Sequence, residues 1–199
     1  MNKMNNSKLN VYRLTYLAIM TAIVIILQLL GSFIHLGTFS VSLVLVPIVL
    51  GAVVGGPLGG MYLGAVFGAT VLISGDAALF FTIHPAGTVI TVLVKGMLCG
   101  LCAGLIYHLL AKRNTYVAVT AAAVVCPIVN TGVFLIGGAL FFLEAISSWA
   151  SAEGVGVVAY MFLFLVGGNF IFEFLFNILL CPTIIRLIKL IPVKEARYI

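Results

Sequence analysis

Long apolar runs alternate with short polar or turn-rich breaks along almost the whole chain. Most of these runs approach or exceed the roughly 20 residues that a helix needs to cross a bilayer. The pattern therefore predicts an all-α membrane protein, a single domain over residues 1–199 with six transmembrane helices. The expected spans are approximately 12–32, 41–56, 58–75, 87–111, 115–142 and 158–190.

The composition supports lipid as the solvent for most of the surface. Hydrophobic residues make up 63% of the 199 residues and charged residues only 8%, and the mean hydropathy is +1.30. Soluble domains carry about 25% charged residues, so a soluble globular protein is excluded. We expect neither a separate soluble domain nor a nucleic-acid partner.

The basic residues predict the orientation. They gather before the first span, between the fourth and fifth spans, and near the end of the sixth span. Because basic residues favour the cytoplasmic side, we expect a protein of the cell membrane with both termini in the cytoplasm. The residues that support this orientation are Lys3, Lys8, Arg13, Lys112, Arg113, Arg186, Lys189, Lys194 and Arg197.

Apart from the basic residues near the cytoplasmic ends of the spans, two charged residues, Lys95 and Glu173, fall inside expected spans. An unpaired charge at the centre of a bilayer costs at least about 2.5 to 3.5 kcal/mol on insertion scales, and helix packing alone does not require one. Glu173 also belongs to a stripe, because Asn169 and Asn177 lie four residues before and after it. Residues spaced by four share one face of a helix, so this apolar helix carries an amide, a carboxylate and an amide together.

Depth counting brings polar residues of three spans to one level. Lys95, Asn130 and Asn169 each lie 17 residues from the nearest basic residue on the expected cytoplasmic side. At 1.5 Å per residue this places them roughly 25 Å from that side, with Glu173 and Asn177 one and two turns deeper. The arrangement predicts an outward-facing pocket for a small polar molecule. The alternative is that Lys95 and Glu173 pair with each other while the asparagines join helices.

The external loops above this level are interpreted as a lid. Phe81, His84 and Trp149 lie in the loops after the third and fifth spans and are candidate ligand contacts. Aromatic residues are also common at membrane interfaces without any ligand, and the histidine has the alternative role of stabilising its loop. The loop at 31–42 adds His35, Thr38 and Ser40.

Small residues predict close packing. The segment GGPLGG at 55–60 predicts a tight turn between the second and third spans, and glycines then recur every four residues, a pattern that lets helix backbones approach closely. These glycines are Gly56, Gly60, Gly64 and Gly68. In the first span Ala18 and Ala22 share one face, with packing inside the chain as the default interpretation. The cysteines lie in apolar runs and are interpreted as small buried hydrophobes, so we expect no metal site.

The combination of these features resembles a known family. Six spans with both termini inside, the AIMTA segment at 18–22, VPIVLGAVVGGPLGGMYLGAVFG at 46–68 and GNFIFEFLFNILLCPTIIRLIKL at 168–190 are similar to the substrate-binding S components of energy-coupling factor (ECF) vitamin transporters. The resemblance implies an S-component-like helical bundle that binds a vitamin from outside. It also implies delivery inward with a transmembrane coupling protein, which Ala18 and Ala22 would face, and two cytosolic ATPase subunits.

The resemblance implies no cofactor in this chain, since the partners would use ATP. The pocket residues, Lys95, Glu173 and three asparagines, both donate and accept hydrogen bonds. They favour a vitamin of the size of pantothenate or pyridoxine, and neutral vitamins stay open if Lys95 and Glu173 neutralise each other. An alternative is a solitary secondary transporter that uses Glu173 as a titrating group. An enzyme is not expected, because the spans contain no nucleophile with a base and no metal cluster.

Overall fold

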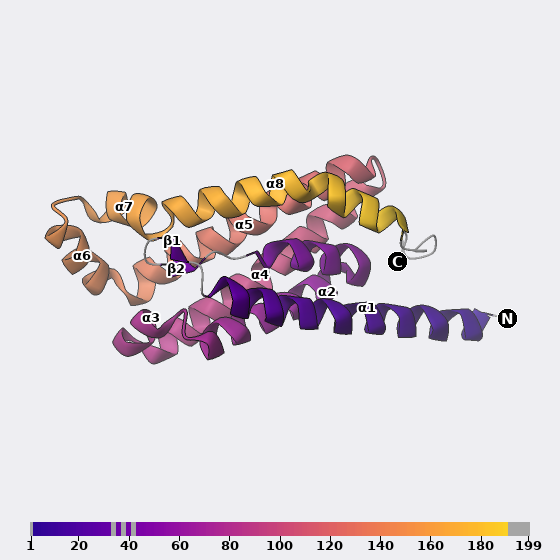
Figure 1. Cartoon of the computed structure of the whole chain (residues 1–199), viewed down its shortest axis with the longest axis horizontal. Helices are drawn as coiled ribbons and strands as arrows, with labels where there is room; N and C mark the ends of the chain where they lie inside the picture. Colours follow the sequence, from indigo (N-terminus) through magenta and orange to yellow (C-terminus); the bar gives the residue numbers. More distant parts are fainter. Residues whose placement is uncertain (1, 33–34, 37–38, 41–42, 191–199) are drawn as a thin grey trace.

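The computed structural model describes residues 2–32, 35–36, 39–40 and 43–190, and nearly all of them are helical. The long helices lie side by side along the longest axis of the molecule, with both termini at one end and the short elements α3, α6, α7 and the β1–β2 pair at the other (Figure 1). Strands β1 and β2 form one small antiparallel pair. The elements are α1 (Asn2–Gly31), β1 (His35–Leu36), β2 (Phe39–Ser40), α2 (Leu45–Ser74), α3 (Ala78–Ile83), α4 (Pro85–Ala111), α5 (Thr115–Phe141), α6 (Leu143–Ala152), α7 (Val157–Tyr160), the π-helix η1 (Met161–Leu165) and α8 (Gly167–Leu190).

Within the described residues, five helices are long and apolar enough to cross a membrane. A sixth is added only if α6 and the α7–η1 segment, which are bent by 92° relative to each other, are counted as one span. The chain is therefore an all-helical multi-pass bundle with one minor β-hairpin.

Helix α2 folds back on itself at Gly56. This residue has φ +75° and ψ −175°, a conformation that side chains oppose and glycine permits, and Pro57 follows without an N–H for the helical ladder. A Cβ atom built on Gly59 would lie 3.2 Å from the Gly51 carbonyl oxygen, whereas eight residues of straight helix span about 12 Å. The turn predicted within 55–60 is confirmed, and α2 consists of two antiparallel arms, 45–55 and 57–74.

Arg13 of α1 contacts this turn. Its Nε donates to the Val54 carbonyl at 3.4 Å, and its guanidinium lies 3.4 Å from where a Cβ of Gly56 would stand. The break at Gly56 interrupts the helical hydrogen bonds at the end of the first arm. Arg13 therefore supplies a donor where the helix itself no longer does.

The second arm of α2 packs directly against α4 through a glycine seam. We use this name for Gly56, Gly60, Gly64 and Gly68 of α2 together with Gly96, Gly100 and Gly104 of α4. The second arm of α2 and helix α4 run antiparallel, with Gly60 opposite Gly100 and Gly64 opposite Gly96. A Cβ at any of these four positions would collide with a backbone carbonyl of the opposite helix. The predicted packing role of the α2 glycines is confirmed, while the matching glycines of α4 had not been anticipated.

The sixth predicted span differs from the structure at its beginning. A helix was expected from 158, but α7 ends at Tyr160, the π-helix η1 follows, and α8 begins at Gly167. Val166 between them leaves helical geometry with φ −124°. Gly167 follows directly, and a Cβ built on it would lie 2.7 Å from the Phe162 carbonyl oxygen, so the close approach of the backbone at this break requires a glycine.

Two hydrophobic clusters stabilise the bundle. The larger one joins α1, α2, α4, α5 and α8 around Phe67, Leu63 and Ile48. The smaller one joins α3, α6 and η1 around Phe80, Phe142 and Ile146. Residues from both clusters line the cavity described next, so the cavity lies where the two clusters meet.

Candidate functional site

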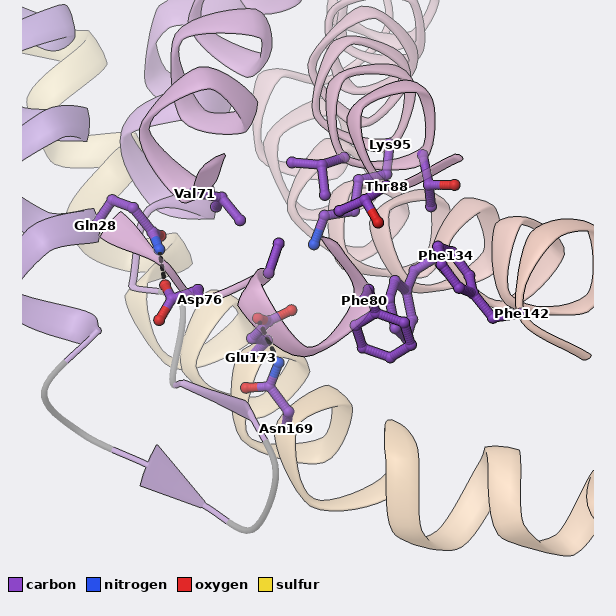
Figure 2. A pocket seen from close by; sticks show the side chains of 13 residues that line it. Gln28, Val71, Asp76, Phe80, Thr88, Lys95, Phe134, Phe142, Asn169 and Glu173 are labelled. Atoms are coloured by element: carbon purple, nitrogen blue, oxygen red, sulfur yellow. Dashed lines mark hydrogen bonds between the residues drawn. The ribbon is translucent and has the colours of Figure 1, made fainter. Parts of the chain in front are cut away.

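A cavity of about 540 Å³, including its open mouth, lies between the helices. Its walls come from α1, α2, α3, α4, α5, α8 and the adjoining turns (Figure 2). The lining residues are Gln28, Val71, Asp76, Ala77, Phe80, Thr88, Thr91, Val92, Lys95, Phe134, Phe142, Asn169 and Glu173. Three residues predicted from the sequence, Lys95, Asn169 and Glu173, are thus brought together.

The polar stripe of α8 forms a connected set of hydrogen bonds. Glu173 is only 1% exposed, and its Oε1 accepts from Asn169 Nδ2 at 3.0 Å. One turn further along, Asn177 Nδ2 donates to the backbone carbonyl of Glu173 at 2.8 Å. Asn177 is buried but does not line the cavity. Asn169 and Glu173 therefore face the cavity, while Asn177 lies beneath them.

Lys95 reaches the cavity from α4 between two aromatic rings. Its Nζ lies 5.5 Å from the ring centroid of Phe67 and 5.5 Å from that of Phe134. Ring faces at this distance attract a cation through their quadrupole, which offsets part of the cost of removing the ammonium from water. Thr88 and Thr91 precede Lys95 on the same helical face and also line the cavity.

Gln28 and Asp76 form a second polar pair at the cavity wall. Gln28 Nε2 donates to Asp76 Oδ2 and links α1 to the turn after α2 (Figure 2). Gln28 is 1% exposed. The sequence pattern identified neither Gln28 nor Asp76 as a candidate ligand contact. An available signal was that Gln28 is the single amide in the apolar stretch from 14 to 31.

Asn130 lies beside Lys95 in an adjoining cavity of about 310 Å³. This second cavity shares Lys95, Phe134 and Asn169 with the first. Thr131 of α5 and two residues at the η1–α8 break complete its lining. Lys95, Asn130 and Asn169, which the sequence placed at one depth, therefore line one cavity from three different helices.

Phe81, His84 and Trp149 lie outside both sets of lining residues. Phe81 is 47% exposed, and its neighbour Phe80 points into the cavity instead. Trp149 packs edge-on against Phe80 with ring centroids 6.0 Å apart, so it supports the wall from behind. His84 Nδ1 accepts from the Gly87 N–H at 2.8 Å and caps the start of α4. Their contacts with a ligand stay predictions.

The loop at 31–42 lies largely outside the described residues. Thr38 is not among the described residues, and for His35 and Ser40 only the strand positions in β1 and β2 are described.

Several buried polar atoms at this site have no hydrogen-bond partner among the described residues. These are Gln28 Oε1, Thr91 Oγ1, Asn130 Oδ1, Asn169 Oδ1 and Asn177 Oδ1. A buried polar group without a partner costs about 1 to 3 kcal/mol, and the large majority of buried polar side-chain atoms in proteins have one. All but Asn177 Oδ1 belong to residues that line one of the two cavities. The arrangement is suited to hold a small polar molecule.

Ala18 and Ala22 lie on an exposed face of α1. Nearby Leu14 is 71% exposed, so this face does not pack against the rest of the bundle. The default interpretation, packing within the chain, does not hold for these two alanines.

Comparison with known proteins agrees with this architecture. A family model described as the substrate-specific component of ECF transporters matches residues 12–188. A search of curated proteins and a search of solved structures gave no match. The matched region includes every described residue of both cavities. The chain therefore belongs to the family of ECF transporter substrate-specific components, which are membrane-embedded transporter subunits.

Proposed function

We propose that this protein is the high-affinity capture subunit of an ATP-driven ECF importer. It binds a vitamin or related micronutrient, of the size of pantothenate or pyridoxine, in an outward-facing pocket. It then delivers the molecule inward together with a transmembrane coupling protein and two cytosolic ATPase subunits. The observation that carries this proposal is the cavity lined by buried polar atoms without partners, in a chain of the S-component family.

The proposed topology has six membrane-embedded segments, with the two arms of α2 counted separately and both termini in the cytoplasm. The turn at Gly56 then lies on the same side as Arg13 and as the basic pair between α4 and α5. The cavity residues come from the last turns of α1 and the first turns of α4 and α8, which are the ends remote from the termini. The first arm, about 16 Å long at 1.5 Å per residue, reaches from the turn into the outer half of the bilayer.

Glu173 provides the first test. Mass spectrometry of the purified protein identifies the molecule that co-purifies with it, and calorimetry measures its affinity for the wild type and for Glu173→Ala. We expect the substitution to abolish binding while the protein stays inserted and folded. Glu144→Ala, which removes an exposed carboxylate of α6, is the control. Unchanged affinity in Glu173→Ala would show that Glu173 does not contact the ligand.

The exposed alanines are the proposed contact with the coupling protein. Their small side chains leave a flat strip on α1 against which another helix can pack closely. Replacing both Ala18 and Ala22 with leucine should leave ligand binding intact and block uptake in cells that contain the full complex. Normal uptake by this double variant would contradict the docking role.

A solitary secondary transporter with Glu173 as the titrating group remains the alternative. It predicts uptake by the chain alone in vesicles with a proton gradient and no ATPase subunits. The capture-subunit proposal predicts binding but no accumulation under those conditions. Family membership favours the latter.

A further inference from the structure

We propose that the cavity selects a compact aromatic molecule that carries an N–H donor group, such as an ammonium or an amino substituent. This inference rests on the proposed capture function and narrows the substrate chemistry that the proposal leaves open. The donor group would face an acceptor cluster, our name for the side-chain oxygens of Gln28, Asp76, Asn169 and Glu173.

Two carboxylates orient the amides of this cluster. An ionised carboxylate only accepts hydrogen bonds, so the amide that contacts it must turn its NH₂ group toward it. Asn169 Nδ2 faces Glu173 Oε1 at 3.0 Å, and Gln28 Nε2 faces Asp76 Oδ2. Each pairing leaves the amide oxygen directed elsewhere, and neither Asn169 Oδ1 nor Gln28 Oε1 has a partner among the described residues.

Two further atoms without partners among the described residues also add acceptors rather than donors. Thr91 Oγ1, at the same cavity, is a hydroxyl oxygen that can accept, and Asn130 Oδ1 is an acceptor in the adjoining cavity. Lys95 is the only cationic donor among the described lining residues, and its ammonium lies between two phenylalanine rings. A ligand that completes these hydrogen bonds must therefore mainly donate. An ammonium donates three times, a hydroxyl once, and a carboxylate not at all.

The charges of the lining residues also favour a ligand with an ammonium group. The described lining residues include two carboxylates, Asp76 and Glu173, and one ammonium, Lys95. With all three ionised, their sum is one negative charge. A cationic group on the ligand offsets that charge in a site where water screens little, whereas an anionic ligand adds to it.

The opposite wall explains the aromatic part of the proposal. Figure 2 shows the two hydrogen-bonded pairs on one side of the cavity and the rings of Phe80, Phe134 and Phe142 on the other. Phe80 contacts Phe134 edge to face with centroids 5.6 Å apart, and Phe142 with centroids 5.0 Å apart. A flat ring packs well against such a wall while its amino substituent reaches the acceptor cluster.

A matched ligand series tests the inference. Binding of pyridoxamine, pyridoxine and 4-pyridoxic acid to the purified full chain in lipid nanodiscs is measured by calorimetry at pH 7. The three molecules share one ring and differ chiefly in an ammonium, a hydroxyl or a carboxylate. Benzylamine, benzyl alcohol and benzoate repeat the comparison on a simpler ring. We expect the ammonium member to bind roughly tenfold or more tightly than the hydroxyl member, and the carboxylate member to bind most weakly.

Variants connect this ranking to the acceptor cluster. Asp76→Asn and Glu173→Gln keep the side-chain volume and remove one charge, so each should reduce the preference for the ammonium member several-fold. Glu144→Gln makes the same chemical change on the exposed surface of α6 and should leave the ranking unchanged. Asp76 lies in a partly exposed turn, where a substitution disturbs folding less than one at a buried position. The Asp76→Asn variant therefore still tests the inference if Glu173→Gln does not fold.

The outcomes separate this inference from the capture function. Equal affinities, or tightest binding of the carboxylate members, overturn the inference and leave a capture subunit for a different ligand class. Unaltered rankings in both acid-to-amide variants overturn the role of the acceptor cluster. If no member binds and no small molecule co-purifies, the capture function fails and the inference fails with it.

Discussion

The glycine seam and the cavity are neighbouring regions of the same helix pair, yet they are built in opposite ways. At the seam, α2 and α4 approach until the carbonyl of Gly64 lies where a side chain of Gly96 would begin. At the cavity, the preceding residue of α4, Lys95, extends into the space between two aromatic rings. Positions adjacent in sequence point about 100° apart on a helix, so one helix serves both regions.

The difference shows how a membrane bundle positions a binding site. In lipid, helix association relies on close packing and hydrogen bonds rather than on the hydrophobic effect. The seam concentrates that packing along one face and leaves the other faces of α4 free to carry polar residues. Unpartnered buried atoms are then tolerated at the cavity, because the seam stabilises the helices that present them.

The largest expected effect comes from filling the seam. Gly64→Val places a branched side chain against the carbonyl and backbone of Gly96 and Met97, where no flexible side chain can move aside. Overpacking usually costs about 1 to 3 kcal/mol and more where the backbone must shift. We expect loss of the folded monodisperse protein in fluorescence-detected size-exclusion chromatography.

The matched control for the seam is Gly132→Ala in α5, where an added Cβ meets nothing within 4 Å. This variant should keep its unfolding temperature or raise it slightly, since alanine is the better helix former. A Gly64→Val protein as stable as Gly132→Ala would show that the seam is not required.

An intermediate effect is expected at the cavity. Asn169→Leu keeps a similar volume but removes the amide that contacts Glu173 and faces both cavities. The affinity for the co-purifying ligand should fall roughly tenfold to a hundredfold, with little change in unfolding temperature. Asn177→Leu, which lies beneath the cavity, should reduce the affinity less. Equal losses in the two variants would contradict the separation between lining and supporting residues.

The smallest effect is expected at the turn of α2. Arg13→Ala removes the donor to the Val54 carbonyl and should lower the free energy of unfolding by about 1 kcal/mol. Ligand affinity should not change, because the turn lies at the opposite end of the helices from the cavity. Arg113→Ala removes an exposed arginine and serves as the comparison in the same thermal unfolding measurement. An equal shift in both variants would show that the contact with Val54 contributes nothing specific.

Depth along a helix could be predicted well, because the rise per residue is nearly constant. Lys95 and Asn169, on separate helices, were placed at one level and do line one cavity. The turn at Gly56 followed from residue types that end helices. Both features depend on local backbone geometry, which can be inferred from residue types and their spacing in a single sequence.

Rotation about each helix axis could not be predicted in the same way. Phe81 was expected at the site, but Phe80 lines it, because the orientation of the short helix α3 depends on packing against Phe142 and Trp149. The contribution of Gln28 depends on a partner 48 positions away. The break before α8 likewise depends on how η1 packs with α6 in the smaller hydrophobic cluster. Hydropathy along the chain carries no information about that packing.

Helix α1 is joined to α2 and to the turn after it by side-chain hydrogen bonds at three levels, one of them from Thr21 Oγ1 to the Tyr62 hydroxyl at 3.4 Å, and this attachment has a mechanical consequence. Arg13 contacts Val54 near one end, and Gln28 contacts Asp76 near the other, about 22 Å apart at 1.5 Å per residue. Ala18 and Ala22 lie between these points on the exposed side. A ligand that displaces Gln28 would therefore free the end of α1 next to the cavity while the contacts of Arg13 and Thr21 persist, and the exposed strip of Ala18 and Ala22 would tilt relative to α2.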